Sequence, residues 1–327
     1  MPHSATIDVH AHFLPPVYRD ALLSRGFKTV DGGMPVPDWS EDRALAMMDD
    51  VGITGAMLSV SSPHINFVTQ ADALTLCRAV NDFAAEAKQR HPARFGAFAI
   101  LPLPDITAAV AEAEHALDQL GLDGVALPTH TEGKYLGDQH LTPLLQFLND
   151  RRATVFIHPT SPCCFEAIGL ALPAPMIEFP FDTTRAAASL LYSGAFARFP
   201  NISFILPHAG GTLPFLAPRM AAVGSIPILG DRAMPPPAAL QALAGLYYDT
   251  ALSTTPQQIA ALRALAPITQ ILYGSDYPFS PAERVRFSET AFAALPFTAE
   301  EEALVRHGNA ARLFPAFVDR CCGRREV

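Results

Sequence analysis

The sequence predicts a single (β/α)₈ barrel, and two observations lead to this fold class. Short apolar runs rich in β-branched and aromatic residues alternate with segments of helical periodicity, and they do so eight times along the chain. The length of 327 residues exceeds that of a usual domain, but α/β barrels commonly reach it as one unit. We therefore expect one barrel domain over residues 1–327, with a doubly wound open sheet as the structural alternative.

Each predicted strand is a short apolar run, as expected for parallel strands that are buried on both faces. In chain order these runs are 6–12, 53–60, 95–103, 124–130, 153–158, 202–208, 246–252 and 268–276.

The segments between the strands carry the signals of helices. Apolar residues such as Leu74, Cys77 and Val80 recur at three- and four-residue steps, which places them on one helix face. Helix starts are predicted at Thr255, which precedes a proline, and at Thr298, which forms a capping box with a glutamate three residues later. The long loops at 13–40 and 159–181 are expected to form the rim over the functional site.

Composition argues for some classes of partner and against others. Charged residues make up 17% of the chain, below the roughly 25% of soluble proteins, so we expect a large core and a homodimer. A net charge of −9 argues against nucleic acid and anionic membranes. The apolar runs are about ten residues long, short of the ~18 that span a bilayer, and no signal peptide is recognisable. We expect a cytoplasmic protein with reduced cysteines.

Histidines gather at the ends of the predicted strands. The chain has 11 histidines, and those at strand ends are His10, His12, His130, His158 and His208. In a barrel all strand ends open onto one face, so residues far apart in sequence converge there. A single such histidine is more often a buried structural residue, but so many together favour a metal site.

The predicted ligands come from three strands. His10 and His12 are two residues apart, so their side chains point the same way. Asp276 ends the last strand, which neighbours the first in a closed barrel, and His158 faces them from the fifth. Three imidazoles and one carboxylate with an open position suit Zn²⁺ or another divalent first-row ion.

Three further polar residues lie on the predicted strands that carry the histidines, and each has its own expected role. His208, followed by Ala209-Gly210-Gly211, is predicted as a general acid/base because Asp276 is close enough to orient it; a fifth metal ligand or a structural hydrogen bond is the alternative. His130 either contacts the substrate or caps the barrel. Asp8 is expected to make buried hydrogen bonds at the start of its strand.

No other catalytic pattern has a fitting context. Glycine-rich nucleotide-binding motifs and the G-x-S-x-G motif of serine hydrolases do not occur in the right places. Cys163 and Cys164 lack the surroundings of a nucleophile, so we expect them to pack within their loop.

Five segments together resemble the amidohydrolase-related decarboxylases, which act on aminocarboxymuconate semialdehyde, γ-resorcylate or 6-methylsalicylate. They occur in the family's order and are Ile7-Asp8-Val9-His10-Ala11-His12, Ile157-His158-Pro159, His208-Ala209-Gly210-Gly211, Gly274-Ser275-Asp276-Tyr277-Pro278-Phe279 and Gly308-Asn309-Ala310 through Phe314. The segment 179–186 is most similar to the 6-methylsalicylate branch.

The resemblance implies a barrel of the amidohydrolase superfamily and a metal-dependent, oxygen-independent loss of CO₂ from a small aromatic carboxylic acid. By position, His208 would be the catalytic acid/base together with Asp276, and Arg219 would reach the substrate of a neighbouring subunit. The residues that would hold Zn²⁺ or Mn²⁺ are His10, His12, His158 and Asp276.

Two departures separate the chain from the aminocarboxymuconate enzyme. Arg43 is out of register with that enzyme's carboxylate-binding arginine, and the single tryptophan, Trp39, leaves no counterpart for its active-site tryptophan. The resemblance therefore favours an aromatic acid with one carboxylate as the substrate.

The expected chemistry follows from these parts. A divalent cation can bind a phenolate oxygen and the adjacent carboxylate together, and a proton from His208 to the carboxyl-bearing carbon lets CO₂ depart. Phe13, Phe165 and Phe279 are expected to seat the ring and exclude water. The main alternative is a metal-dependent hydrolase of a lactone or amide on the same scaffold. A third hypothesis is a metal-binding protein without catalytic activity.

Overall fold

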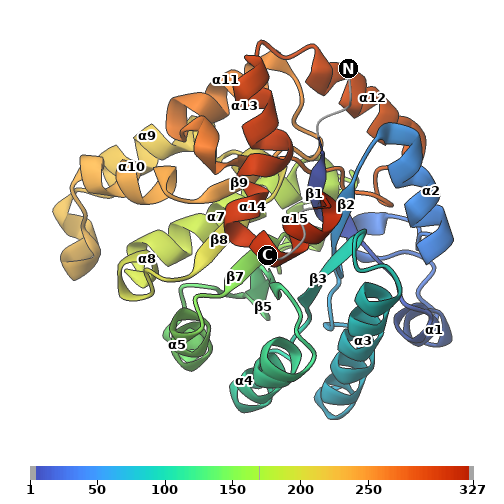
Figure 1. Ribbon diagram of the computed structural model, residues 1–327. Helices are drawn as coiled ribbons and strands as arrows, with labels where there is room; N and C mark the ends of the chain where they lie inside the picture. The colour runs from blue at the N-terminus through green and yellow to red at the C-terminus, as the bar shows by residue number, and fades with distance from the viewer. Residues whose placement is uncertain (1–4, 169, 324–327) are drawn as a thin grey trace.

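The computed structural model describes residues 5–168 and 170–323, in which eight parallel strands form one sheet (Figure 1). The strand order is β1-β2-β3-β4-β7-β8-β9-β10, and a hairpin of β5 (His130–Thr131) and β6 (Lys134–Tyr135) lies apart from it. The strands of the large sheet are β1 (Ile7–His12), β2 (Gly55–Ser59), β3 (Phe95–Ala99), β4 (Gly124–Pro128), β7 (Thr154–His158), β8 (Ser203–Leu206), β9 (Tyr247–Asp249) and β10 (Ile271–Leu272).

The sheet closes between β1 and the segment that follows β10. The backbone N–H of Val9 donates to the carbonyl of Tyr273 at 3.0 Å, and that of Asp276 donates to the carbonyl of His10 at 2.8 Å. An open doubly wound sheet would leave these two edges apart. The predicted (β/α)₈ barrel is therefore confirmed.

The helices surround the barrel, as Figure 1 shows. Both predicted helix starts are present, because Thr255 and Thr298 each form a capping box with the residue three positions later. The helices are α1 (Pro16–Ser24), α2 (Glu41–Val51), α3 (Gln70–Arg90), α4 (Ile106–Glu114), α5 (Thr142–Asp150), α6 (Phe165–Ile168), α7 (Glu178–Tyr192), α8 (Ala195–Arg198), α9 (Leu213–Val223), α10 (Pro236–Ala244), α11 (Pro256–Leu265), α12 (Ala282–Ala293), α13 (Ala299–Ala303), α14 (Ala310–Leu313) and α15 (Pro315–Cys321).

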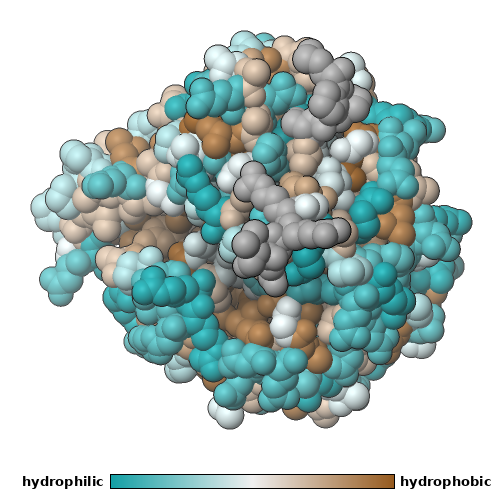
Figure 2. Space-filling model, in the orientation of Figure 1, coloured by the Kyte–Doolittle hydropathy of each residue, from teal (hydrophilic) through white to brown (hydrophobic). Residues whose placement is uncertain are grey.

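Two apolar cores support the barrel. One fills the space between strands and helices. The other fills the barrel interior, where Ile7, Phe98 and Phe156 pack against Phe314 and Phe317 from the C-terminal helices. Figure 1 shows α14 and α15 crossing the barrel centre, and Figure 2 shows hydrophobic residues in a hollow within the ring of hydrophilic outer helices. The end where the strands begin is thus closed, which leaves the opposite mouth for a site.

Several strands end earlier than predicted. The run 95–103 leaves the sheet after Ala99, and 202–208 leaves it after Leu206. The run 268–276 begins as a 3₁₀ turn and contributes only Ile271 and Leu272 as a strand. At His208 and Asp276, the last residues of two predicted strands, φ angles of 55° and 63° lie in the left-handed region, so an extended strand cannot include either residue.

The two long loops contain short helical segments. Residues 13–40 include α1 and a 3₁₀ turn, η1 (Asp31–Gly33), and residues 159–181 include α6 and the start of α7. Cys163 and Cys164 are exposed and free, so the expected packing within the loop is wrong; the turn that leads into α6 leaves both in solvent. Among the described residues, no helix combines the length and apolarity needed to cross a membrane.

Candidate metal centre and active site

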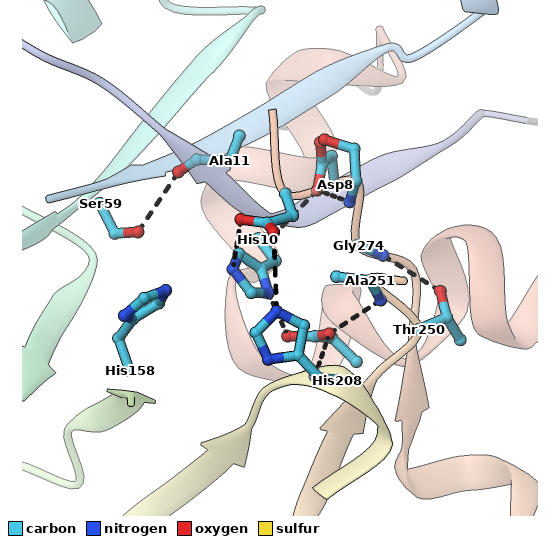
Figure 3. Close-up of polar contacts among 12 residues, drawn as sticks. Asp8, His10, Ala11, Ser59, His158, His208, Thr250, Ala251 and Gly274 are labelled. Atoms are coloured by element: carbon cyan, nitrogen blue, oxygen red, sulfur yellow. Dashed lines mark hydrogen bonds and ion pairs between the residues drawn. The ribbon is translucent and has the colours of Figure 1, made fainter. Parts of the chain in front are cut away.

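The four predicted metal ligands meet at the open mouth of the barrel. The ligand atoms of His10, His12, His158 and Asp276 all lie within 4.8 Å of one another, and all four residues are buried. His10 Nε2 lies 3.0 Å from His12 Nε2, and Asp276 Oδ1 lies 3.1 Å from His12 Nε2 and 3.4 Å from His10 Nε2. Figure 3 shows His158 reaching toward His10 from a separate strand.

Strand β1 brings its two histidines to the mouth through an irregularity. Its pairing with β2 shifts register between Asp8 and Ala11. Ile7 and Val9 point into the barrel interior, so an unbroken two-residue alternation would place His10 on the opposite side from them. Asp8 accepts hydrogen bonds from the backbone N–H groups of His10 and Ser275, both at 3.0 Å, which is the buried role expected for it.

Each ligating histidine is held by an acceptor on its Nδ1 atom. A proton fixed on Nδ1 leaves the lone pair on Nε2, where it faces the cluster and can bind a metal. The three pairs are His10 Nδ1 with Asp249 Oδ2 at 2.8 Å, His12 Nδ1 with the Ser59 carbonyl at 3.2 Å, and His158 Nδ1 with the Pro159 carbonyl at 2.9 Å.

Asp249 is a site residue that the sequence analysis missed. It ends β9, is fully buried, and holds two parts of the site together. Its Oδ2 accepts from His10, while its Oδ1 accepts the backbone N–H groups of His208 at 3.0 Å and Ala251 at 2.9 Å. It lies inside the seventh predicted strand, 246–252, where a carboxylate within a mostly apolar run was the signal that could have revealed it.

The electrostatics of the cluster fit a divalent cation. Burial lowers the pKa of His12 and of His158, which keeps both imidazoles neutral and able to bind metal. Burial would raise the pKa of Asp276, but hydrogen bonds from His10, His12 and His208 outweigh it and hold that pKa well below its usual range.

His10 differs from the other two ligating histidines. Burial alone would lower its pKa, but Asp249 and Asp276 outweigh this and raise it to about 10. A cation bound to these donors would balance the two buried carboxylates in place of that proton. The donor set and its charges therefore form a site for a divalent metal ion.

His208 lies beside the cluster. It begins a 3₁₀ turn, η5 (His208–Gly210), with Nε2 3.7 Å from Asp276 Oδ2 and its ring centroid 5.0 Å from that of His10. Its Nδ1 is buried and finds no hydrogen-bond partner within the described part of the chain. A ring next to the ligands with an unused nitrogen can carry a proton to or from a bound molecule.

A cavity of about 460 Å³ opens at the cluster, and His158, His208 and Asp276 line it. Most of its wall is apolar, and its other polar side chains are serines, Gln258 and Asp31. No lysine or arginine is found among the described residues that line it. The apolar lining residues include Val30, Met34, Pro175, Met176, Phe179, Pro180, Pro214, Phe215, Leu252 and Phe279.

The residues predicted to bind substrate are only partly brought together. Phe279 lines the cavity, with its ring centroid 5.4 Å from that of His12. Phe13 is buried against Trp39 and away from the cavity. His130 is engaged by the backbone: its Nε2 donates to the Ser161 carbonyl at 3.1 Å.

Two further predicted residues lie outside the cavity wall. Arg219 is exposed on α9, and Phe165 lines a separate hollow next to α7. Arg43, which is out of register with the family's arginine, forms an exposed ion pair with Asp38 at 2.8 Å.

His64 is a second residue that the sequence analysis missed. It is 1% exposed, and its ring centroid lies 5.8 Å from that of His158. Neither of its ring nitrogens has a hydrogen-bond partner among the described residues, and burial lowers its pKa to about 3. It follows the second strand after a serine-rich turn, so its position beyond a strand end was the available signal.

Comparison with known proteins places this site in a family. The family model described as amidohydrolase matches residues 7–316. The decarboxylase yanB of Aspergillus niger is 36% identical over 95% of this chain and 88% of its own length. The 6-methylsalicylic acid decarboxylase acuB of Aspergillus aculeatus is 37% identical over 94% of this chain and 96% of its own.

A solved structure agrees with these relatives. The crystal structure of an amidohydrolase II is 34% identical, covers 95% of this chain and 100% of its own, and superposes with a TM-score of 0.88. The family match spans the barrel from β1 to α15, and the identity of a third or more extends over nearly the whole chain, so this protein belongs to the amidohydrolase family.

Proposed function

We propose that the protein is a metal-dependent carboxy-lyase that removes CO₂ without oxidation from a small aromatic hydroxy acid, such as 6-methylsalicylate or a hydroxybenzoate. One observation carries the proposal: His208, with an unused buried nitrogen, lines the same apolar cavity as the metal-binding cluster. Relatives that share over a third of the sequence and are named decarboxylases support the class of reaction.

His10, His12, His158 and Asp276 would hold the divalent ion. We propose Zn²⁺, because three imidazoles and a carboxylate suit it, with Mn²⁺ as the alternative. When bound, the ion supplies the positive charge that holds the carboxylate and an adjacent phenolic oxygen of the substrate. The substrate anion needs this positive charge because no basic side chain among the described residues lines the cavity.

The residues of the chain perform the remaining steps. Phe179 and Phe279 contribute apolar wall that seats the ring and excludes water. His208 gives a proton to the ring carbon that carries the carboxyl group, and Asp276 Oδ2, 3.7 Å from His208 Nε2, is close enough to orient the imidazole. The carbon–carbon bond then breaks, its electron pair restores the aromatic ring, and CO₂ departs.

The role of His208 is tested by the variant His208→Ala. Turnover should fall by about 10² to 10⁴, the usual contribution of a positioned proton donor. Metal content, measured by elemental analysis, should stay the same, because His208 is outside the ligand set. A variant with near-normal turnover would remove His208 from the mechanism.

The reaction class is tested with ortho-hydroxy aromatic acids, including 6-methylsalicylate, in ¹⁸O-labelled water. A decarboxylase releases CO₂ under anaerobic conditions, and the product gains one solvent proton at the vacated ring carbon. The opposing outcome is no CO₂ from any aryl acid together with ¹⁸O uptake from lactones or amides, which would make the protein a hydrolase.

We also propose that the protein is a homodimer whose interface lies beside the cavity mouth. Phe215 is 85% exposed although it lines the cavity, and Met176 on the same rim is 64% exposed. Arg219 lies four residues after Phe215 on α9, and therefore on the same helix face. A partner subunit would cover the apolar side chains and bring Arg219 close to a cavity.

A further inference from the structure

Asp31 is the one acidic side chain on the cavity wall besides the predicted ligand Asp276, within the described part of the chain. It belongs to the turn η1, in the loop that connects β1 with α2. No step of the proposed reaction involves Asp31. A carboxylate facing a cavity for an anionic substrate needs an explanation, because like charges repel.

Hydrogen bonds from two other loops hold Asp31 in place. Its Oδ2 accepts the hydroxyl of Ser62 at 2.5 Å and the backbone N–H of Ser161 at 2.7 Å. Ser62 follows β2, and Ser161 follows β7, the strand that ends in His158. The carboxylate is therefore fixed relative to the strand ends that carry the site.

Asp31 also lies near the metal-binding cluster. Ser61, the neighbour of Ser62, has its hydroxyl 3.4 Å from His158 Nε2. The proposed function assigns the substrate carboxylate to the cluster, so Asp31 would face another part of the ring.

The second carboxylate oxygen of Asp31 remains available. The two hydrogen bonds both go to Oδ2, and Oδ1 accepts none from the described residues, while the half-buried side chain lines the cavity. No lysine or arginine on the described cavity wall neutralises it. A preorganised acceptor with a negative charge favours a donor group and disfavours an anion.

We propose that Asp31 determines substrate specificity: its Oδ1 accepts a hydrogen bond from a hydroxyl group on the ring, and its charge excludes acids with a second carboxylate. This inference rests on the proposed decarboxylase function. Within the hydroxy acids of the proposed function, it names as preferred substrates the aromatic monocarboxylic acids that carry a further ring hydroxyl besides the ortho-hydroxyl, ahead of those that carry a methyl group there.

The test compares salicylates that carry one added hydroxyl, methyl or carboxylate group at each free ring position. For the wild type, we compare the three substituents at the ring position where an added hydroxyl gives the highest kcat/KM. At that position kcat/KM should be highest for the hydroxyl and lowest for the carboxylate. In Asp31→Asn, the amide oxygen can still accept from Ser62 and Ser161, but an NH₂ donor replaces Oδ1. The hydroxyl-to-carboxylate ratio of kcat/KM should then fall by about 10- to 100-fold, mainly through KM.

Two matched variants isolate the effect. Asp38→Asn removes an exposed carboxylate from the same loop and should leave the ratio unchanged. Ser62→Ala weakens the hold on Asp31 but keeps its charge, so it should still reject the second carboxylate.

The possible results separate this inference from the proposed function. Release of CO₂ from no aryl acid overturns the proposed function, whereas CO₂ release with an unchanged ratio in Asp31→Asn overturns only the role of Asp31. If Asp31→Asn fails to fold, calorimetric binding of the same acids to the metal-loaded wild type decides. The inference is contradicted if the acid with a second carboxylate binds as tightly as the acid with an added hydroxyl, or more tightly.

Discussion

Two buried carboxylates, Asp249 and Asp276, organise the histidines at the barrel mouth. Asp276 contacts His10 and His12 through Oδ1 and His208 through Oδ2. Asp249 contacts His10 from the opposite side of its ring and also holds the backbone of His208. The position of each imidazole therefore depends on acidic residues from other strands.

Asp249→Asn should weaken metal binding by about 10- to 100-fold, the usual effect of losing the partner that orients a ligating histidine. The amide removes the charge that keeps His10 basic and its Nδ1 oriented. Competition with a chelator of known affinity measures the change. The exposed Asp231→Asn serves as the control, and equal affinity in both variants would show that His10 needs no such partner.

His64 should make stability depend on pH. Burial lowers its pKa from 6.5 to about 3, so the unfolded chain binds a proton below pH 6.5 that the folded chain refuses. Stability is therefore lost as pH falls from 6.5 toward 3. His64→Asn, which suits the φ of 52° at this position, should lose less stability between pH 7 and pH 5.

Urea unfolding of the metal-loaded protein at both pH values provides the measurement for His64. His140→Asn, at an exposed histidine, should keep the pH dependence of the wild type. If the stability of His64→Asn and of the wild type depends on pH in the same way, folding does not lower the pKa of His64.

At the scale of elements, the cavity wall depends on a close approach between the loop after β8 and helix α7. Gly211 has a φ of 64°, and a Cβ added there would overlap the carbonyl oxygen of Pro180 in α7. The same carbonyl accepts the Thr184 hydroxyl at 2.9 Å, which fixes its direction. A residue with a side chain at 211 must therefore displace α7, which carries Phe179 of the cavity wall.

Gly211→Ala should destabilise the protein by about 1–3 kcal/mol more than Gly230→Ala. Gly230 also has a positive φ, 55°, but nothing lies within 4 Å of a Cβ built there. The comparison therefore separates the collision from the backbone strain that both variants share. Equal midpoints of urea unfolding for the two variants would contradict the packing argument.

At the scale of the whole molecule, closure of the barrel gives one filled end and one open end. The C-terminal helices pack into the end where the strands begin. The metal-binding cluster and the cavity occupy the other end, and exposed apolar side chains surround the cavity mouth. A surface of this kind is typical of an interface with another protein.

Light scattering at micromolar concentration should give the mass of a dimer. Phe215→Ser should shift the protein toward the monomer, because it removes the most exposed apolar side chain of the rim. Phe287→Ser is the control, since Phe287 is 65% exposed on α12 and lies outside the cavity wall. A wild type that is monomeric and fully active would contradict the proposed interface.

The sequence by itself determined the features that depend on local pattern. Eight apolar runs and the capping boxes at Thr255 and Thr298 predicted the barrel and its helix starts, because both arise from neighbours in the chain. Strand-end histidines predicted which side chains would meet, because a parallel barrel brings the same end of every strand to one face.

Only the tertiary structure decided what depends on contacts between strands and loops. The left-handed backbone at His208 and Asp276 and the register shift in β1 left no mark in residue spacing. Asp249 and Asp31 looked like ordinary acidic residues, since a carboxylate acquires its role from the partners that burial supplies. Phe13 and His130 lie at predicted strand ends as the ligands do. However, Phe13 packs against Trp39, and His130 hydrogen-bonds the backbone carbonyl of Ser161.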